Sequence, residues 1–364
     1  MIEEIPDAGP TSLAPFDEII DVRTPAEFAE DHLPGAVNFP VLSNEERAVV
    51  GTIYKQDSRF KARRLGAAMI ARNVAAHLEG PLADRPAKWR PLLYCWRGGM
   101  RSGAMATILD RVGWRVGVLN GGYKTWRREV VAGLRDSAAP INVILLDGQT
   151  GTAKSDILAR VAGTGAPAID LETIAAHRGS AFGAFAATPQ PSQKLFESRL
   201  WDALRRLDPS RPILLEAESN HIGACEIPKR LWKAMLSAPR IAIRADADRR
   251  ADYLLRAYAD ILGDGAAITT AIDRIAHLHD KARIDEWRTL ADAKDFRALT
   301  LRLMREHYDP LYDRTRSRRD GGAFAEIDLV SFEITALDVA AQEICAILAR
   351  AGWTSGAPAP YEKA

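Results

Sequence analysis

Residues 141–155, INVILLDGQTGTAKS, join an apolar run to a loop that contains two glycines. A helical pattern begins at about Ser155, directly after the loop. An apolar run of this kind is typical of a strand buried on both faces, as in a parallel sheet covered by helices. The stretch therefore predicts an α/β architecture with a tightly turned loop at the carboxyl end of a strand.

The loop GQTGTAKS (148–155) has the composition and the strand–loop–helix context of a phosphate-binding loop. The two glycines would allow the backbone to approach a phosphate closely, and Lys154 would reach the phosphates. Ser155 would hold a Mg²⁺ ion if one binds. Ala153 stands where a second glycine is usual, and we expect it to fit if its φ stays negative. The alternative is an ordinary strand-to-helix turn. The candidate phosphate-binding residues are Gly148, Thr150, Gly151, Thr152, Ala153, Lys154 and Ser155.

Strands and helices alternate on both sides of this loop, and small residues with a proline at 136–140 separate two such patterns. The predicted strands lie at 18–23, 91–96, 115–120, 211–219 and 240–246. The predicted helices lie at 102–113, 123–134 and 335–352, with a mainly helical part from Ala247 to about residue 307. We therefore expect one domain over 1–135, a second over 141–352 and a flexible tail over 353–364.

The composition excludes several classes of protein. Lys and Arg number 49 and Asp and Glu 48, so the formal net charge is +1, and local basic clusters would have to hold any nucleic acid. No stretch approaches the roughly 18 apolar residues of a membrane span, and the acidic start MIEEIPDAGP is no signal peptide. Three cysteines without a CxxC pair predict neither a disulfide scaffold nor a structural metal. We expect a cytoplasmic protein without membrane contact.

Cys95 ends an apolar strand and opens the loop CWRGGMRSG (95–103), which a helix follows. The Gly-Gly pair allows the backbone to curl, so that N–H groups point at the sulfur. We expect the helix start at Ser102 to add positive partial charge and Arg97 and Arg101 to add full charges. Together these groups should lower the pKa of the thiol below about 8.5 and favour the thiolate. The candidate catalytic residues are thus Cys95, Arg97 and Arg101, and the alternative is a buried structural cysteine.

Three segments in this part of the chain resemble the rhodanese family. They are DVRTPAEFAEDHLPGAVNFP (21–40), the cysteine loop, and LNGGYKTW (119–126), and they occur in the family's order. The resemblance covers about residues 15–135 and implies a rhodanese-like parallel-sheet domain. Rhodanese-like domains carry sulfur or selenium on their loop cysteine, and Cys95 occupies that position. His32, in the His-x-Pro-Gly-Ala turn, matches a structural position of the motif.

The spacing of Cys95 and Arg101, with five residues between them, is also that of cysteine phosphatases. A loop of this width suits a phosphate-sized substrate, either a phosphate ester or selenophosphate. Phosphatases usually place a histidine just before the cysteine, where this chain has Tyr94.

Over nearly its full length the chain resembles the family of bacterial tRNA 2-selenouridine synthases. The resemblance implies a rhodanese-like domain followed by a P-loop NTPase-like α/β domain with a mainly helical C-terminal part. The segments that carry it are YCWRGGMRSG (94–103), GQTGTAKS (148–155), DLETIAAHRGSAFG (170–183), QPSQKLFESRL (190–200), LLEAES (214–219) and YDPLYDR (308–314).

This resemblance implies a transferase that modifies the wobble uridine in the anticodon region of tRNA. The 2-thio group is first geranylated with geranyl diphosphate, and selenium from selenophosphate then replaces the geranylthio group at C2. These two compounds would be the co-substrates, and the enzyme that supplies selenophosphate is a further candidate partner. Lys154 would help to hold the diphosphate. Cys95 would take selenium and carry it to the base, with Arg97 and Arg101 stabilising the departing phosphate.

Several other residues are candidates for the substrate site. Glu216 and Glu218 end the strand in LLEAES and would orient a metal ion or water, with Asp170 as a weaker candidate. His177 and Arg178 would line the site. For each of these groups the alternative is a solvated position. The remaining candidates are Arg249 and Arg250, which would act on phosphate from a lid, and the run RTRSRR (314–319) beside Tyr308 and Tyr312, which would contact RNA.

Two other classes of function stay open. One is a rhodanese-fold cysteine phosphatase or sulfurtransferase with a nucleotide-sensing P-loop domain, and the other is a non-catalytic module whose loop binds nucleotide to regulate a partner. A phosphatase would release phosphate from aryl phosphates, and Cys95→Ser would abolish that release. The sequence leaves open whether ATP or GTP binds, which tRNAs are substrates and what the oligomeric state is.

Overall fold

The computed structural model describes residues 2–137, 140–185, 188–263, 265–317 and 323–350, without the side chains of 315–317. The chain splits into two compact units. The first comprises the residues up to Ser137 together with Glu197–Asp202, and the second comprises the other described residues. The predicted tail at 353–364 lies outside the described residues.

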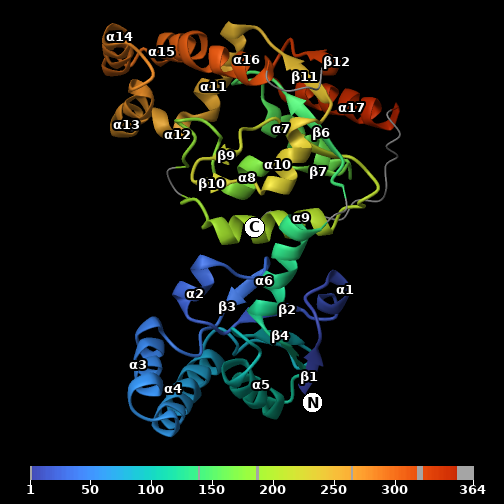
Figure 1. The fold of residues 1–364 in the computed structure, drawn as a ribbon, viewed down its shortest axis with the longest axis vertical. Helices are drawn as coiled ribbons and strands as arrows, with labels where there is room; N and C mark the ends of the chain where they lie inside the picture. The colour runs from blue at the N-terminus through green and yellow to red at the C-terminus, as the bar shows by residue number, and fades with distance from the viewer. Residues whose placement is uncertain (1, 138–139, 186–187, 264, 318–322, 351–364) are drawn as a thin grey trace. The chain divides into compact units, whose positions relative to one another are not determined.

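The first unit is built on a parallel sheet in the order β1-β5-β4-β2-β3 (Figure 1). The three strands predicted in this part are confirmed, whereas β1 and β3 were not predicted. Most side chains of β1 are exposed, and β3 has only three residues. Apolar side chains of the sheet and its helices, among them Ile20, Leu93, Met105 and Leu109, form the core. The strands are β1 (Ile2–Ile5), β2 (Glu18–Asp21), β3 (Ala36–Asn38), β4 (Pro91–Tyr94) and β5 (Val116–Leu119).

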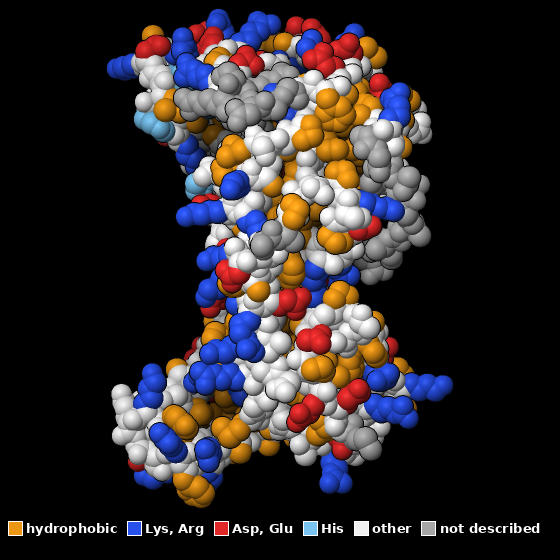
Figure 2. Space-filling model, turned by 45° about the vertical axis from the view of Figure 1, so that its right-hand side comes forward, with side chains coloured by type: hydrophobic (Ala, Val, Ile, Leu, Met, Phe, Trp, Pro, Cys, Tyr) orange, Lys and Arg blue, Asp and Glu red, His pale blue; other side chains and the backbone are white. Residues whose placement is uncertain are grey.

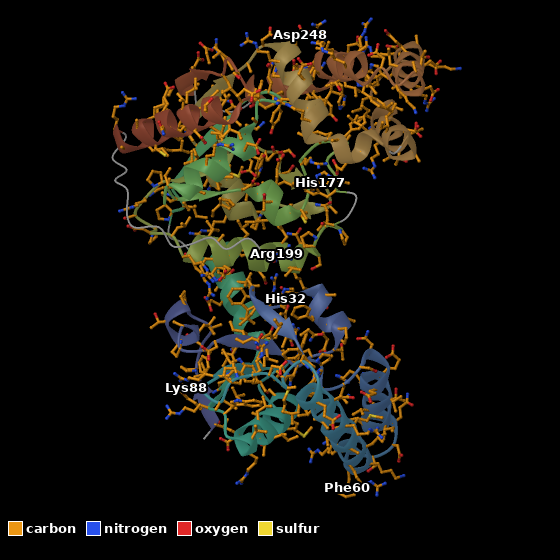
Figure 3. The ribbon with its side chains drawn as sticks, turned by 180° about the vertical axis from the view of Figure 1, so that it is seen from behind. His32, Phe60, Lys88, His177, Arg199 and Asp248 are labelled. Carbon is orange, nitrogen blue, oxygen red and sulfur yellow. The ribbon has the colours of Figure 1, made fainter. Side chains whose placement is uncertain are left out.

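The first unit contains two long helices, α3 and α4, that pack against each other. Neither helix was predicted from the sequence. Only a narrow stripe of α4, namely Ala62, Gly66, Ile70 and Val74, is buried, so its apolar pattern is weak. Phe60, at the start of α4, is 72% exposed (Figure 3). The helices are α1 (Pro10–Leu13), α2 (Pro25–Glu30), α3 (Asn44–Gln56), α4 (Arg59–Glu79), α5 (Met100–Val112) and α6 (Tyr123–Val131), with a π-helical turn η1 (Ala132–Asp136).

The second unit is built on a parallel sheet in the order β12-β11-β6-β8-β7. Because β6 is central and β8 and β7 follow it, the carboxyl ends of these three strands lie at one edge, where ligands bind in α/β sheets. The strand β12 was missed by the sequence analysis, because most of its side chains stay partly or fully exposed. The strands are β6 (Val143–Asp147), β7 (Ala168–Ile169), β8 (Ile213–Glu216), β11 (Arg240–Arg244) and β12 (Ala323–Asp328), with a small hairpin of β9 (His221–Ile222) and β10 (Cys225–Glu226).

The predicted helical part follows β11 and has an apolar core of its own around Ile272, Trp287 and Leu299. Acidic and basic side chains are interspersed over the surface at the top of Figure 2. One ion pair of the helical part joins Arg288 to Asp273 at 2.7 Å. None of the described helices is long and apolar enough to cross a bilayer. The helices of this unit are α7 (Lys154–Gly163), α8 (Leu171–Ala175), α10 (Lys229–Leu236), α11 (Ala247–Ala257), α12 (Ala259–Leu262), α13 (Gly265–Ala276), α14 (Lys281–Asp292), α15 (Phe296–Leu303), α16 (Asp309–Ser317) and α17 (Ile334–Arg350), with a π-helical turn η2 (Met304–Tyr308). The helix α9 (Gln193–Arg205) is divided, because its segment Glu197–Asp202 belongs to the first unit and its two ends belong to the second.

Candidate functional site

Cys95 lies directly after β4, and its residue is only 3% exposed. Its Sγ accepts hydrogen bonds from the Gly99 backbone N–H at 3.2 Å and from the Ser102 hydroxyl at 3.3 Å. The helix α5 begins at Met100, two residues before the predicted start at Ser102. Ser102 therefore lies in the first turn, where its hydroxyl as well as its backbone faces the sulfur.

These donors determine the acidity of the thiol. Burial alone raises the pKa of Cys95, but the Ser102 hydroxyl and the backbone N–H groups of Ser102, Arg97 and Gly99 outweigh it, so the pKa is lowered. A lowered pKa means that the nucleophilic thiolate is populated at lower pH than in a free cysteine. The expected thiolate cradle is thus present, with backbone and hydroxyl donors as its main cause.

The Gly-Gly segment after β5 closes against the cysteine loop. A side chain at Gly122 would overlap with the Cys95 carbonyl oxygen, and one at Gly98 would overlap with the Leu119 carbonyl oxygen. Both glycines have positive φ, 56° and 64°. The Tyr123 N–H donates to that Cys95 carbonyl at 2.8 Å. The two loops therefore hold each other, which gives the Gly-Gly motif a structural reason.

The two arginines of the cysteine loop differ in their surroundings. The guanidinium of Arg101 donates to both carboxylate oxygens of Glu27, at 2.6 and 3.1 Å. This pair uses two of the five N–H groups of a guanidinium and fixes its orientation. Arg97 is exposed, and no partner of its side chain is found among the described residues. Arg101 is therefore an oriented anion donor, whereas Arg97 remains a charge at the rim.

The early rhodanese-like segment is structural. The buried Arg23 forms an ion pair with Asp21 at 2.6 Å and stacks on the Tyr123 ring at 4.1 Å. The Tyr94 hydroxyl accepts from the Leu33 N–H at 3.2 Å. His32, labelled in Figure 3, bonds to the Phe28 carbonyl at 2.8 Å. The hydrogen bonds of Tyr94 and His32 thus go to backbone groups and not to the sulfur of Cys95.

The loop at 148–155 follows β6 and precedes α7. The Lys154 Nζ bonds to the Gly148 carbonyl at 2.8 Å, and the Thr152 hydroxyl bonds to the Gln149 carbonyl at 2.8 Å. Ala153 has φ +55° and ψ +32°, so the condition of a negative φ, under which an alanine was expected to fit, is not met. The backbone takes the left-handed conformation that a glycine would adopt, and Ala153 bears the steric cost.

Two side chains from the helical part support the loop. The buried Arg250 donates to the Thr150 carbonyl at 3.0 Å and forms an ion pair with Asp309 at 2.8 Å. The Tyr312 hydroxyl accepts from the Gly148 N–H at 2.6 Å. Arg249 instead donates to the Val330 carbonyl and does not line the cavity at the loop, so the structure does not give it the expected lid position. Of the run RTRSRR, only the Arg314 side chain is described.

Four carboxyl groups gather where β7 and β8 end. The Ser155 hydroxyl donates to Glu172 at 2.8 Å, and the Glu172 N–H donates to Glu216 at 2.7 Å. Burial, then the charge of Glu218, raises the pKa of Glu172 to about 8. Burial also raises the pKa of Glu216 and of Asp170. Glu172 therefore keeps its proton near neutral pH. Glu172 was not among the predicted site residues, although it lies in the family segment DLETIAAHRGSAFG (170–183).

A cavity of about 920 Å³ opens over the phosphate loop. Its walls include Glu172 and Glu218, but neither Glu216 nor His177. The Nδ1 of His177 accepts from the Gly179 N–H at 3.1 Å, and this bond shapes the loop (Figure 3). Other lining residues are Lys154, Ser155, Arg178, Tyr253, Tyr258 and Tyr312.

Arg178 is one of several cationic side chains that line this cavity. Its guanidinium stacks on the rings of Phe185 and Tyr258, at 4.2 and 4.7 Å, and pairs with Asp260 at 2.9 Å. Its Nη1 is buried and has no hydrogen-bond partner among the described residues. An N–H donor in this state favours an anionic ligand.

No group of three His, Cys, Asp or Glu side chains is arranged to hold a metal ion in the described part of the chain. Ser155 and the carboxylates beside it are oxygen ligands of the kind that Mg²⁺ prefers. Cys225 is buried, and Cys345 packs partly buried against the sheet core; neither forms a disulfide in the described part of the chain.

The fold and the two sites define an α/β protein that combines a thiolate cradle with a phosphate-loop cavity. Two family models match, the rhodanese-like domain over residues 7–129 and the tRNA 2-selenouridine synthase AAA domain over residues 141–271. A tRNA 2-selenouridine synthase of Cupriavidus pinatubonensis is 32% identical over 83% of this chain and 89% of that protein.

Two further tRNA 2-selenouridine synthases are similar. The protein of Shewanella denitrificans is 32% identical over 83% of this chain and 89% of its own length. The protein of Hahella chejuensis is 38% identical over 66% of this chain and 63% of its own length. The chain belongs to the tRNA 2-selenouridine synthase family.

Proposed function

We propose that the chain is a tRNA-modifying transferase that replaces the 2-thio group of wobble 2-thiouridine by selenium, through a geranylated intermediate. Membership of the family supports the overall reaction. One observation supports a two-step route: the chain has two separate anion sites of different chemistry, a thiolate cradle and a cavity with a phosphate loop. The first suits selenophosphate and the second suits a diphosphate.

In the first step, the sulfur of 2-thiouridine attacks C1 of geranyl diphosphate. A C–S bond forms, the C–O bond breaks, and diphosphate leaves with the electron pair. The N–H groups of the phosphate loop, Lys154 and the unpartnered Nη1 of Arg178 would stabilise that leaving group. A Mg²⁺ ion held by the Ser155 hydroxyl would add charge to the same site, provided that diphosphate oxygens complete its coordination.

In the second step, the Cys95 thiolate attacks the phosphorus of selenophosphate. An S–P bond forms, and the P–Se bond breaks, so that selenium leaves as selenide with the electron pair. Selenide then displaces geranylthiolate at C2, and water hydrolyses phosphocysteine to thiol and phosphate. Capture of selenium by the thiolate, as the resemblance suggested, would require removal of two electrons by an oxidant. The cradle of N–H groups and the oriented Arg101 suit the phosphoryl group.

The partner in this proposal is the anticodon region of tRNA, and an enzyme that makes selenophosphate is a further candidate. The near-zero net charge means that tRNA is held by local contacts.

Purified protein, 2-thiouridine tRNA, geranyl diphosphate and selenophosphate test the proposal, with nucleosides analysed by mass spectrometry. We expect 2-selenouridine from the wild type, only geranylated 2-thiouridine from Cys95→Ser, and neither product from Lys154→Ala. Absence of both products with the wild type would refute the proposed function. An aryl phosphate assay run in parallel tests the phosphatase alternative, which predicts phosphate release that depends on Cys95.

A further inference from the structure

An apolar hollow of about 70 Å³ lies among the helices of the second unit. None of the described residues that line it is charged. The hollow is bounded by α11, α12, α13, α15 and η2. Several of its lining residues also belong to the apolar core of the helical part. Its lining residues include Phe182, Leu255, Ile261, Ile268, Phe296, Leu299, Thr300, Leu303 and Met304.

The hollow and the phosphate-loop cavity share part of their walls. Thr150 of the loop itself borders both, as do Ser180, Leu254, Tyr258 and Tyr308. A ligand whose phosphates are bound by the loop would therefore have an adjoining apolar space within reach.

The π-helical turn η2 contributes to this arrangement. Its first and last residues, Met304 and Tyr308, both line the hollow, and Tyr308 also lines the cavity. A π turn widens a helix and occurs frequently at functional sites. Met304 is a flexible side chain that adapts to an apolar ligand.

The chemistry of the two spaces selects one class of ligand. A nucleobase in the hollow would bury N–H and C=O groups against mostly apolar walls, and each unpaired polar group is costly. A hydrocarbon chain gains from the same burial. We infer that the hollow receives the end of a short isoprenoid chain whose diphosphate is bound by the phosphate loop. This inference rests on the proposed function, and it assigns the residues that would recognise the chain.

The size of the hollow implies selectivity for chain length. Its volume equals about two water molecules in the liquid, at roughly 30 Å³ each. The hollow can thus take the tip of a chain that begins in the larger cavity, but not several additional isoprene units. We expect dimethylallyl diphosphate to leave it empty and farnesyl diphosphate to overfill it.

A filling variant tests this inference. Thr300 is half-buried in α15 and lines the hollow, so Thr300→Phe should fill it with less disturbance than a change at a fully buried residue. Thr289→Phe, at an exposed position of α14, is the matched control. Binding of geranyl diphosphate and of inorganic diphosphate is measured by calorimetry, together with prenyl transfer from the dimethylallyl, geranyl and farnesyl diphosphates to 2-thiouridine tRNA.

We expect the wild type to bind geranyl diphosphate more tightly than inorganic diphosphate. Thr300→Phe should weaken the binding of geranyl diphosphate roughly tenfold or more, which is the size of effect that steric changes have in other apolar pockets. The binding of inorganic diphosphate should not be weakened. Leu299→Ala, which enlarges the hollow, should shift preference toward farnesyl diphosphate.

The inference is overturned if geranyl and inorganic diphosphate bind the wild type equally, or if Thr300→Phe and Thr289→Phe have the same chain-length preference. If geranyl diphosphate binds as expected but no prenyl group reaches tRNA, the hollow stands and the proposed function fails.

Discussion

The Sγ of Cys95 shows how single contacts set the chemistry of this chain. A cysteine of which only 3% is exposed would ordinarily hold its proton, because burial disfavours the thiolate. Donors from Gly99 and Ser102 reverse that preference. Of these, only the Ser102 hydroxyl can be removed without altering the backbone.

Ser102→Ala should therefore raise the pKa of Cys95. The rate of alkylation, followed by mass spectrometry of the Cys95 peptide, rises with pH through the pKa, so its midpoint should move to higher pH in the variant. Thr107→Val removes a hydroxyl from the same helix that bonds to the Gly103 carbonyl, and it should leave the midpoint unchanged. Equal midpoints in Ser102→Ala and wild type would show that the hydroxyl does not stabilise the thiolate.

Ala153 is the second residue at which local physics is decisive. A left-handed φ costs a non-glycine residue roughly 1–2 kcal/mol, and replacement by glycine removes this cost. Part of the gain is lost, because glycine has more conformational freedom in the unfolded chain. Ala153→Gly should thus raise the free energy of unfolding by about 0.5–1 kcal/mol in a denaturant titration. The same change at Ala159, exposed in the interior of α7, should lower it by about 1 kcal/mol. Destabilisation by both changes would contradict the backbone conformation described for Ala153.

At the scale of elements, the phosphate loop depends on helices far away in sequence. Arg250 of α11 connects the loop carbonyl of Thr150 to Asp309 at the start of α16. The segment YDPLYDR (308–314) thus supplies a buried partner to the arginine that supports the loop. Tyr312 from the same segment also contacts the loop.

Arg250→Ala should lower the free energy of unfolding by about 3 kcal/mol, because it leaves Asp309 largely buried without its partner. Arg249→Ala, one residue earlier and exposed, should change it by no more than about 0.5 kcal/mol. Denaturant titrations of the two variants measure both values. Similar losses in the two would mean that Arg250 does not anchor the loop.

The carboxyl cluster at the ends of β7 and β8 predicts a pH dependence of stability. Glu172 has a pKa of about 8 when folded, against a usual value of 4.5. Between these values the folded state keeps a proton that the unfolded state has lost, so this group lowers stability as pH rises from about 5 to 8.

Glu172→Gln should remove that loss. The variant should match the wild type near pH 5 and exceed it near pH 8.5 by at least about 1.4 kcal/mol, the equivalent of one pKa unit. Glu343→Gln, at an exposed position of α17, should show no such trend in thermal or denaturant unfolding. A difference between Glu172→Gln and wild type that is constant with pH would contradict the buried, protonated Glu172.

At the scale of the whole molecule, the apolar strands and the two strand–loop–helix motifs were sufficient to predict two α/β units with their parallel sheets. Strand β1, strand β12 and helices α3 and α4 were missed, because most of their side chains are exposed and carry little apolar periodicity. Residues near a motif in sequence, such as Lys154, were predictable as part of the phosphate-loop cavity.

Partners distant in sequence were not predictable in this way. Glu27 lies 74 residues from Arg101, and Asp309 lies 59 residues from Arg250, so neither pair has a local signal. The left-handed conformation of Ala153 was not predictable, because the loop's tertiary support overrides the preference of the residue. His177 and Arg249 carry side chains suited to a phosphate site, but their hydrogen bonds serve other parts of the backbone.

In the proposed function, the two sites perform successive steps on one tRNA. Supplying tRNA that already carries geranylated 2-thiouridine tests it most directly, with selenophosphate added and nucleosides measured by mass spectrometry. Lys154→Ala should then form 2-selenouridine at nearly the wild-type rate, whereas Cys95→Ser should form none. Selenium incorporation by Cys95→Ser, or its loss in Lys154→Ala, would contradict the division of labour between the thiolate and the phosphate loop.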